Sequence, residues 1–131
     1  MSYDYELNAY ARNPSHSKNG GTPILSYQTA TTVSGIEVRL YADMLNRMLR
    51  KHGELKNMKS KILETVIPPD LVLGGHENEL LALKHYEKTP FGAKHIVVVY
   101  SENKHLIITA FLTSEPSRLL KKRRIVWRKQ T

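Results

Sequence analysis

The chain has 131 residues and a net charge of +8, and its 40% hydrophobic content is enough for the core of one domain. It contains no cysteine, which excludes disulfides, thiolate metal sites and cysteine nucleophiles and fits a reducing cytoplasm, where we expect the protein to reside. We expect no membrane span, because no apolar run approaches the roughly 18 residues that cross a bilayer, and no signal peptide, because the first residues lack its basic and apolar regions.

The first half of the chain predicts an arm, a strand and two helices. Residues 1 to 34, rich in Asn, Ser, Gly and Tyr, are expected to form an irregular N-terminal arm, with an irregular strand favoured at "TPILSYQTATTV". The compact domain is expected to span residues 35 to 131 and to begin with the alternating strand "GIEVRLYA". A short helix follows the N-cap residue Asp43, and a second helix starts at Asn57 and ends before Pro68.

The second half of the chain is dominated by strand patterns. They lie in "DLVLGG", "ELLALKHYEK", the two arms of "KHIVVVYSENKHLIITAF" and the basic "RRIVWR". This order predicts an α+β domain, in which two short helices pack on one face of a four- to five-stranded antiparallel sheet. The other face of such a sheet would be open to a ligand.

The hairpin in this half predicts two unlike faces. If Tyr100 pairs with His105, Thr109 shares a face of mixed polar and apolar side chains with Lys94. The opposite face is almost wholly apolar and holds Val97, Val99, Leu106, Ile108, Ala110 and Leu112. We therefore expect the apolar face to pack on the helices and the Thr109 face to be open.

Polar residues of neighbouring strands are expected to gather on this open face. They are Lys84, Tyr86, Thr109, Arg124 and Arg128. Cations suit the charged oxygens of a phosphodiester, hydroxyls donate to them, and an aromatic ring stacks on a base. Each residue alone has an ordinary structural explanation, such as the strand propensity of Thr or the solvation of Lys. Their convergence on one face is what indicates a site.

The positive charge is concentrated at the C-terminus. Residues 118 to 131 carry seven Lys or Arg and no acid, which leaves +1 for the rest of the chain. A concentrated basic patch is typical of nucleic-acid binders, so we expect Lys121, Lys122, Arg123 and Arg128 to contact phosphates. A solvated tail and a contact with an anionic membrane are the alternatives, but the strand pattern "RIVWR" argues against a free tail.

The histidines are scattered along the chain. No H-E-x-x-H or C-x-x-C pattern is present, so no metal and no cofactor are expected. His52 ends the first helix, where the helix dipole favours a cation. His85 is ambiguous because its strand alternates poorly, and the alternation places His95 on the inner face.

Five segments together resemble a known superfamily. They are "NRMLRKHGEL", "ILETVIPPDLVLGG", "KHIVVVY", "HLIITAF" and "RRIVWR". Over residues 35 to 128 their order resembles the barnase–EndoU–colicin–RelE superfamily of small RNases, most nearly its phage- and polymorphic-toxin-associated branches. The chain departs from that pattern at Arg47, where related sequences often carry a histidine, with His52 five residues later.

The resemblance implies a metal-independent endoribonuclease, such as a toxin or phage-defence effector, that cleaves RNA by attack of a ribose 2′-OH on the adjacent phosphate. Carried onto this chain, it makes His52 the candidate acid or base, with Lys84 as the alternative base. Arg47 and Arg124 would stabilise the phosphate, and Thr109 would donate a hydrogen bond to it.

Two other functional classes stay open. A non-catalytic nucleic-acid-binding module on the same sheet would use the same cations and aromatics without an acid–base pair. A protein-interaction domain would use the basic C-terminal segment to bind an acidic partner, such as an antitoxin or immunity protein. The site predicted here requires His52, Thr109 and Arg124 to converge on one groove, and divergence by more than roughly 10 Å would remove that constellation, because acid–base chemistry needs hydrogen-bond reach.

Overall fold

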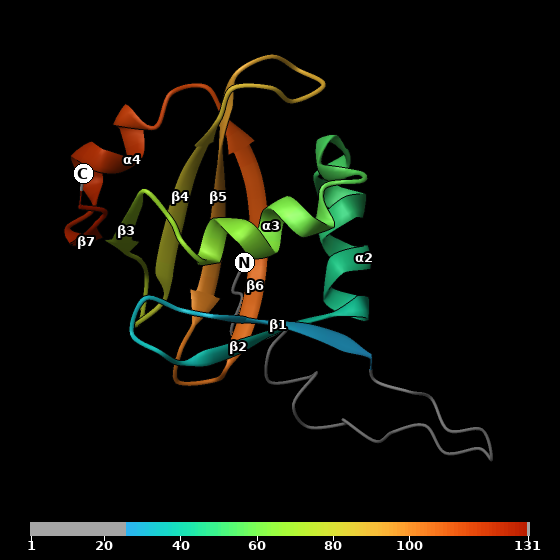
Figure 1. Ribbon diagram of the computed structural model, residues 1–131, viewed down its shortest axis with the longest axis horizontal. Helices are drawn as coiled ribbons and strands as arrows, with labels where there is room; N and C mark the ends of the chain where they lie inside the picture. Colours follow the sequence, from blue (N-terminus) through green and yellow to red (C-terminus); the bar gives the residue numbers. More distant parts are fainter. Residues whose placement is uncertain (1–25, 131) are drawn as a thin grey trace.

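The computed structural model describes residues 26–130, which form one seven-stranded sheet with three α-helices and a short 3-10 helix. In chain order the elements are β1 (Tyr27–Thr31), β2 (Glu37–Tyr41), α2 (Ala42–Lys51), the 3-10 helix η1 (Gly53–Leu55), α3 (Lys59–Val66), β3 (Leu71–Gly74), β4 (Leu80–Tyr86), β5 (Lys94–Ser101), β6 (Leu106–Thr113), α4 (Ser117–Lys122) and β7 (Ile125–Arg128). The strands follow the order β1-β2-β6-β5-β4-β3-β7 across the sheet (Figure 1).

The α+β class is confirmed, but the predicted sheet was too small and too regular. The sheet has seven strands, and β2 runs parallel to β6 through the pair Arg39 and Leu106, while the other pairings are antiparallel. The basic segment contains the helix α4 ahead of its strand. β1 lies within the stretch assigned to the arm, of which residues 1–25 lie outside the described part. Within residues 26–130 no helix is long and apolar enough to cross a membrane.

The two predicted helices form close to their expected positions. In α2, Met44 and Met48 lie one turn apart and are buried, and the helix starts at Ala42, one residue before Asp43. In α3, Ile62 and Val66 form the same one-turn pair. α3 ends just before the two prolines that follow Ile67, because proline cannot continue a helix.

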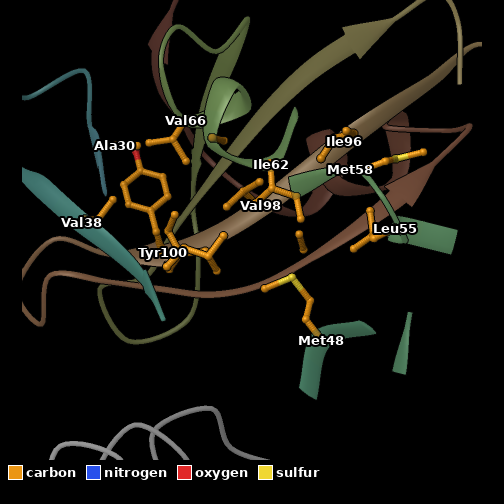
Figure 2. Close-up of a cluster of buried hydrophobic side chains, with 14 of the residues drawn as sticks. Ala30, Val38, Met48, Leu55, Met58, Ile62, Val66, Ile96, Val98 and Tyr100 are labelled. Carbon is orange, nitrogen blue, oxygen red and sulfur yellow. The ribbon is translucent and has the colours of Figure 1, made fainter. Parts of the chain in front are cut away.

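The inner face of the sheet, defined here as the face that α3 covers, carries the larger core. α3 lies in front of the sheet in Figure 1. The buried residues of this cluster are Ala30, Val38, Leu40, Met48, Leu55, Met58, Ile62, Val66, Val72, Ala82, Ile96, Val98, Tyr100, Ile107 and Ala110. Figure 2 draws 14 of these residues, and the labelled ones include Met48 of α2, Ile62 of α3 and Val98 of β5.

The outer face, defined here as the opposite side of the same strands, carries a second core. Its buried residues are Met44, Leu73, Leu81, Leu83, Val97, Val99, Leu106 and Ile108, with Leu119 of α4 and Phe111 of β6 packed against them. Both faces of β5 are therefore buried, and residues 96 to 101 are all inaccessible.

The predicted faces of the hairpin are wrong. Tyr100 pairs with Ile107 rather than His105, and a register shift between Val99 and Tyr100 places Thr109 opposite Val99. Thr109 therefore lies on the outer face with Val97 and Val99, whereas Ile96, Val98 and Tyr100 pack on the helices. The alternation in β5 could not distinguish its faces because both faces are apolar.

Candidate functional site

Two histidines lie side by side on the outer face of the sheet. His85 of β4 pairs with His95 of β5, and their ring centroids are 4.8 Å apart. Each follows the alternation of its strand, since Leu83 and Val97 on the same face form the preceding cross-strand pair. The pair therefore stands at the end of the sheet where β4 stops and β5 begins.

The environment of this pair favours a neutral imidazole at His95. Burial is the main cause that lowers the pKa of His95 below its ordinary value, and the neighbouring His85 lowers it further. Asp70 acts in the opposite direction. Its Oδ2 accepts a hydrogen bond of 2.8 Å from the backbone N–H of His85, which fixes the carboxylate beside the pair.

A third histidine reaches the same face from the end of α2. The His52 ring lies 6.2 Å from the ring of Phe111, centroid to centroid, and its Nδ1 is 3.5 Å from Glu54 Oε2. Phe111 on β6 pairs with Val97 on β5, so it is the diagonal neighbour of His95. His85 and His95 thus lie side by side on β4 and β5, and His52 approaches the same face over Phe111; we call these three histidines the histidine row.

Cations flank the histidine row on both sides. On α2, Met44 packs in the outer cluster, whereas Met48 packs in the inner cluster. Arg47 and Lys51 follow Met44 by three and seven residues, so helical spacing places them on the Met44 side of the helix. On the other side, Arg128 pairs with Leu71, whose side chain packs on the outer cluster. Figure 1 shows α2 beside β6 and α4 beside β7, on opposite sides of the sheet.

Three of the predicted catalytic residues lie on or beside this face, at different levels along the strands. Arg47 and His52 come from α2, and Thr109 comes from β6 two positions before Phe111. Thr109 is 9% exposed, so its hydroxyl lies in the floor of the face rather than on its surface.

Lys84 and Tyr86 lie on the inner face, away from Thr109, contrary to the predicted grouping. Lys84 Nζ donates a 3.0 Å hydrogen bond to the carbonyl of Pro68. The Tyr86 hydroxyl contacts α3, with hydrogen bonds to Glu64 Oε1 at 3.0 Å and to the Thr65 hydroxyl at 3.1 Å. These contacts support the packing of α3 on the sheet.

Arg124 is remote from the histidine row. Its carbonyl accepts from the Gly74 N–H, and it lines a cavity of about 430 Å³ with Glu79, Glu102 and Asn103 at the opposite end of β4. β7 is four strand spacings from β6, or about 19 Å. Arg124 and His52 therefore do not converge.

The other predicted phosphate ligands lie on or beside α4. Lys121 and Lys122 are exposed in its last turn. Arg123 follows the helix and is partly buried, and its Nε is buried without a hydrogen-bond partner within residues 26–130. The two lysines are therefore better placed than Arg123 to meet a polyanion.

The sequence did not identify His85 and His95 as a pair. The available signal was the equal distance of the two residues from the "EKTPFGA" turn, which pairs them if β4 and β5 form a hairpin. The poor alternation of "ELLALKHY" hid this, because Leu81, Ala82 and Leu83 are all buried and β4, like β5, packs on both faces.

Comparisons of the chain with protein-family models, with curated proteins and with solved structures found no match. Among residues 26–130, no three His, Asp or Glu side chains are grouped so that they could hold a metal ion.

Proposed function

We propose that the protein is a metal-independent endoribonuclease whose active site is the histidine row. The observation that supports this most directly is the pairing of His85 and His95 on one sheet face, with His52 near Phe111 on the same face. Histidine is the side chain best suited to both taking and giving a proton near neutral pH. Such an activity would serve a toxin or phage-defence effector.

The chemistry requires a base, an acid and stabilisation of the phosphate. His95 takes the proton of the ribose 2′-OH, because its lowered pKa keeps the imidazole neutral near pH 7. The 2′ oxygen then bonds to phosphorus while the bond from phosphorus to the 5′ oxygen breaks. The acid that gives the 5′ oxygen its proton is either His85, which lies beside His95, or His52, which lies beyond Phe111. The products are a 2′,3′-cyclic phosphate and a 5′-hydroxyl.

A cation would stabilise the pentacoordinate phosphate. Arg47 on α2 and Arg128 on β7 lie on opposite sides of the outer face, about 19 Å or more apart, so one of them would contact this phosphate and the other a different phosphate of the same strand. Thr109 lies four strand positions from Thr113, the partner of His95, or about 13 Å, so its hydroxyl would donate to a neighbouring phosphate. Donors that are held in place before the reaction act strongly in a site that excludes water.

The test is cleavage of a fluorescently labelled RNA oligonucleotide in the presence of EDTA. The wild-type chain should cleave RNA and spare both DNA and 2′-O-methyl RNA, which lack the attacking hydroxyl. His95→Gln should lower the rate by about 10²–10⁴-fold. His76→Gln is the matched control, because His76 is a histidine with 78% of its side chain exposed, in the β3–β4 connection. Cleavage that stops in EDTA and returns with magnesium would refute the mechanism.

The competing interpretation, a non-catalytic nucleic-acid-binding module, gives a different result in the same assay. It predicts that RNA and 2′-O-methyl RNA bind equally, that neither is cleaved, and that His95→Gln leaves binding unchanged. Separate His85→Gln and His52→Gln variants identify the acid, since only the residue that protonates the 5′ oxygen should become dispensable with a better leaving group.

A further inference from the structure

A small cavity opens at the end of the sheet where His95 lies, on the side of Leu112 and Lys94, which share the inner face with Tyr86. Its volume is about 260 Å³, and it is lined by Glu54, Phe91, Lys94, Leu112, Thr113 and Ser114. Pockets for drug-sized ligands measure about 300–1,000 Å³, so this cavity suits one small ring system.

Two of the lining residues connect the cavity to the histidine row. Thr113 pairs with His95 across β5 and β6. The Glu54 carboxylate lies 3.5 Å from Nδ1 of His52. A group in the cavity would therefore lie at the same end of β5 and β6 as His95, and an RNA chain would pass around that end to reach both places.

Phe91 is presented to the cavity by a turn that is held by hydrogen bonds. The Gly92 N–H donates to the Thr89 carbonyl at 3.0 Å, and the Phe91 N–H donates to the Thr89 hydroxyl at 3.0 Å. The same hydroxyl donates to the Gly92 carbonyl at 2.6 Å. Gly92 adopts φ +87°, which favours glycine.

The ring at the tip of this turn is unusually exposed for its size. Phe91 is 54% exposed, although a phenylalanine that only stabilised the fold would be expected to be buried. Because the turn fixes its backbone, the ring would lose little conformational freedom on binding a flat ligand.

The polar groups around Phe91 match the remaining parts of a nucleotide. Lys94 Nζ donates to the Ser114 hydroxyl at 2.6 Å, which places a cation and a hydroxyl together at the cavity. Thr113 adds a second hydroxyl, and Glu54 adds an acceptor. An aromatic ring stacks on any nucleobase, while a lysine contacts phosphate or sugar oxygens.

We propose that this cavity is a nucleobase subsite, in which the base next to the cleaved phosphodiester stacks on Phe91 of a single-stranded RNA. The proposal rests on the proposed function, since it places the scissile phosphate on the histidine row. A single-stranded substrate follows from the geometry, because a paired and stacked base has no free face to offer Phe91.

The test measures binding separately from cleavage. The probes are two fluorescein-labelled 2′-O-methyl RNA dodecamers, one of uridine and one fully abasic, which cannot be cleaved by 2′-OH attack. Fluorescence anisotropy should show that the wild-type chain prefers the dodecamer with bases. Phe91→Ala should weaken binding of the uridine dodecamer by about 5-fold to 150-fold, the range expected for one lost base stack. It should change binding of the abasic dodecamer far less.

Two variants make the result specific. Phe91→Tyr keeps the aromatic face and should keep the preference for bases. Val126→Ala removes another exposed apolar side chain, 46% exposed on β7, and should leave both affinities unchanged. Comparing the wild-type chain with Phe91→Ala on both dodecamers isolates the contact between the base and residue 91, because effects on the backbone contacts cancel.

The outcomes for the subsite and for the RNase activity are distinguishable. If Phe91→Ala binds the two dodecamers in the wild-type ratio, or if the wild-type chain binds neither, the subsite proposal is wrong, whatever the cleavage assay shows. If the ratio falls with Phe91→Ala but the wild-type chain cleaves no RNA, the subsite stands as a binding site and the proposed RNase activity is wrong.

Discussion

In the part of the chain that the structure describes, Tyr100 places an unpaired hydroxyl in the inner core. Its side chain is fully buried, yet its hydroxyl has no hydrogen-bond partner among residues 26–130. Figure 2 shows the ring beside Val38, with the hydroxyl directed toward Ala30. Burial raises the pKa of Tyr100, because the ionised form would lose its hydration.

Replacing Tyr100 with phenylalanine should stabilise the protein. Tyr100→Phe removes a buried hydroxyl without a partner, and we expect the free energy of unfolding to rise by about 1–3 kcal/mol. Urea denaturation monitored by circular dichroism checks this. Tyr86→Phe is the matched control and should cost about 0.5–1.5 kcal/mol, because the Tyr86 hydroxyl is hydrogen-bonded to α3. Destabilisation by Tyr100→Phe would mean that the hydroxyl has a partner in solution.

His95 should make the stability of the protein depend on pH. Because the folded state lowers the pKa of His95, the unfolded chain binds a proton first as the pH falls. The contribution of the neutral His95 is therefore complete above about pH 6.5, the ordinary value of histidine, and is lost below it. Urea midpoints at pH 7.5 and 5.0 should differ less for His95→Gln than for the wild-type chain. An equal difference in urea midpoint for the wild-type chain and His95→Gln would show that other groups govern the stability between pH 5.0 and 7.5. His76→Gln is the control and should behave like the wild-type chain.

At the scale of single elements, the register shift in the β5–β6 hairpin decides which residues reach the site. Without the shift, strand alternation would place Thr109 on the same face as Ile107, which packs in the inner core with Val98 and Tyr100. With it, the second half of β6 turns Thr109 and Phe111 to the outer face. A bulge of this kind leaves no mark in a hydrophobic pattern that is apolar on both faces.

Neighbouring substitutions in β6 should separate packing from chemistry. Ile108→Ala removes buried methylenes from the outer cluster and should cost about 2–5 kcal/mol of stability. Thr109→Val keeps the shape and β-branching, so it should change stability by no more than about 0.5–1 kcal/mol. If the hydroxyl donates to the phosphate, Thr109→Val should also slow RNA cleavage by about 10-fold to 1,000-fold. Full cleavage activity with Thr109→Val would leave that residue as part of the floor only.

The helices were predictable from the sequence because their information is local. Leu45, Met48 and Leu49 in the first helix, and Ile62 and Val66 in the second, mark the inner faces by their spacing, and the prolines after Ile67 mark an end. The strand pairings that connect distant segments were not predictable. Nothing near residue 39 indicates that β2 runs beside β6, and nothing in "RRIVWR" indicates that β7 extends the sheet beyond β3.

The same distinction explains the candidate site. His52 and Thr109 were candidates through the family resemblance, and their positions at the end of a helix and within a strand were predictable because both features are local. Lys84 and Arg124 were grouped with them only by assumed strand order and parity, and both assumptions fail. The His85–His95 pair depends on a cross-strand register that only the assembled sheet defines.

Across the whole molecule, charge is distributed unevenly, and nucleic-acid binding should reflect this. The pair Lys121→Gln and Lys122→Gln on α4 should reduce the slope of log affinity against log salt by about 1.4, as expected for two phosphate contacts with a single strand. The pair Lys56→Gln and Lys59→Gln removes two exposed cations near the start of α3 and is the control. Its slope should equal that of the wild type. Equal slopes for all three proteins would show that α4 does not contact the nucleic acid.

A single register pair joins β2 to β6, whereas every other pair of neighbouring strands in residues 26–130 is joined by three or more. Around this seam the Arg39 N–H donates to the His105 carbonyl at 3.0 Å, and His105 Nδ1 lies 2.8 Å from the Glu37 carbonyl, so Nδ1 must carry the proton that is shared. Strands β4, β5 and β6 are instead joined along their full lengths. The amide hydrogens at the β2–β6 junction should therefore exchange with deuterium before those at the centre of the sheet, even though Val38 and Leu40 are buried in the inner core.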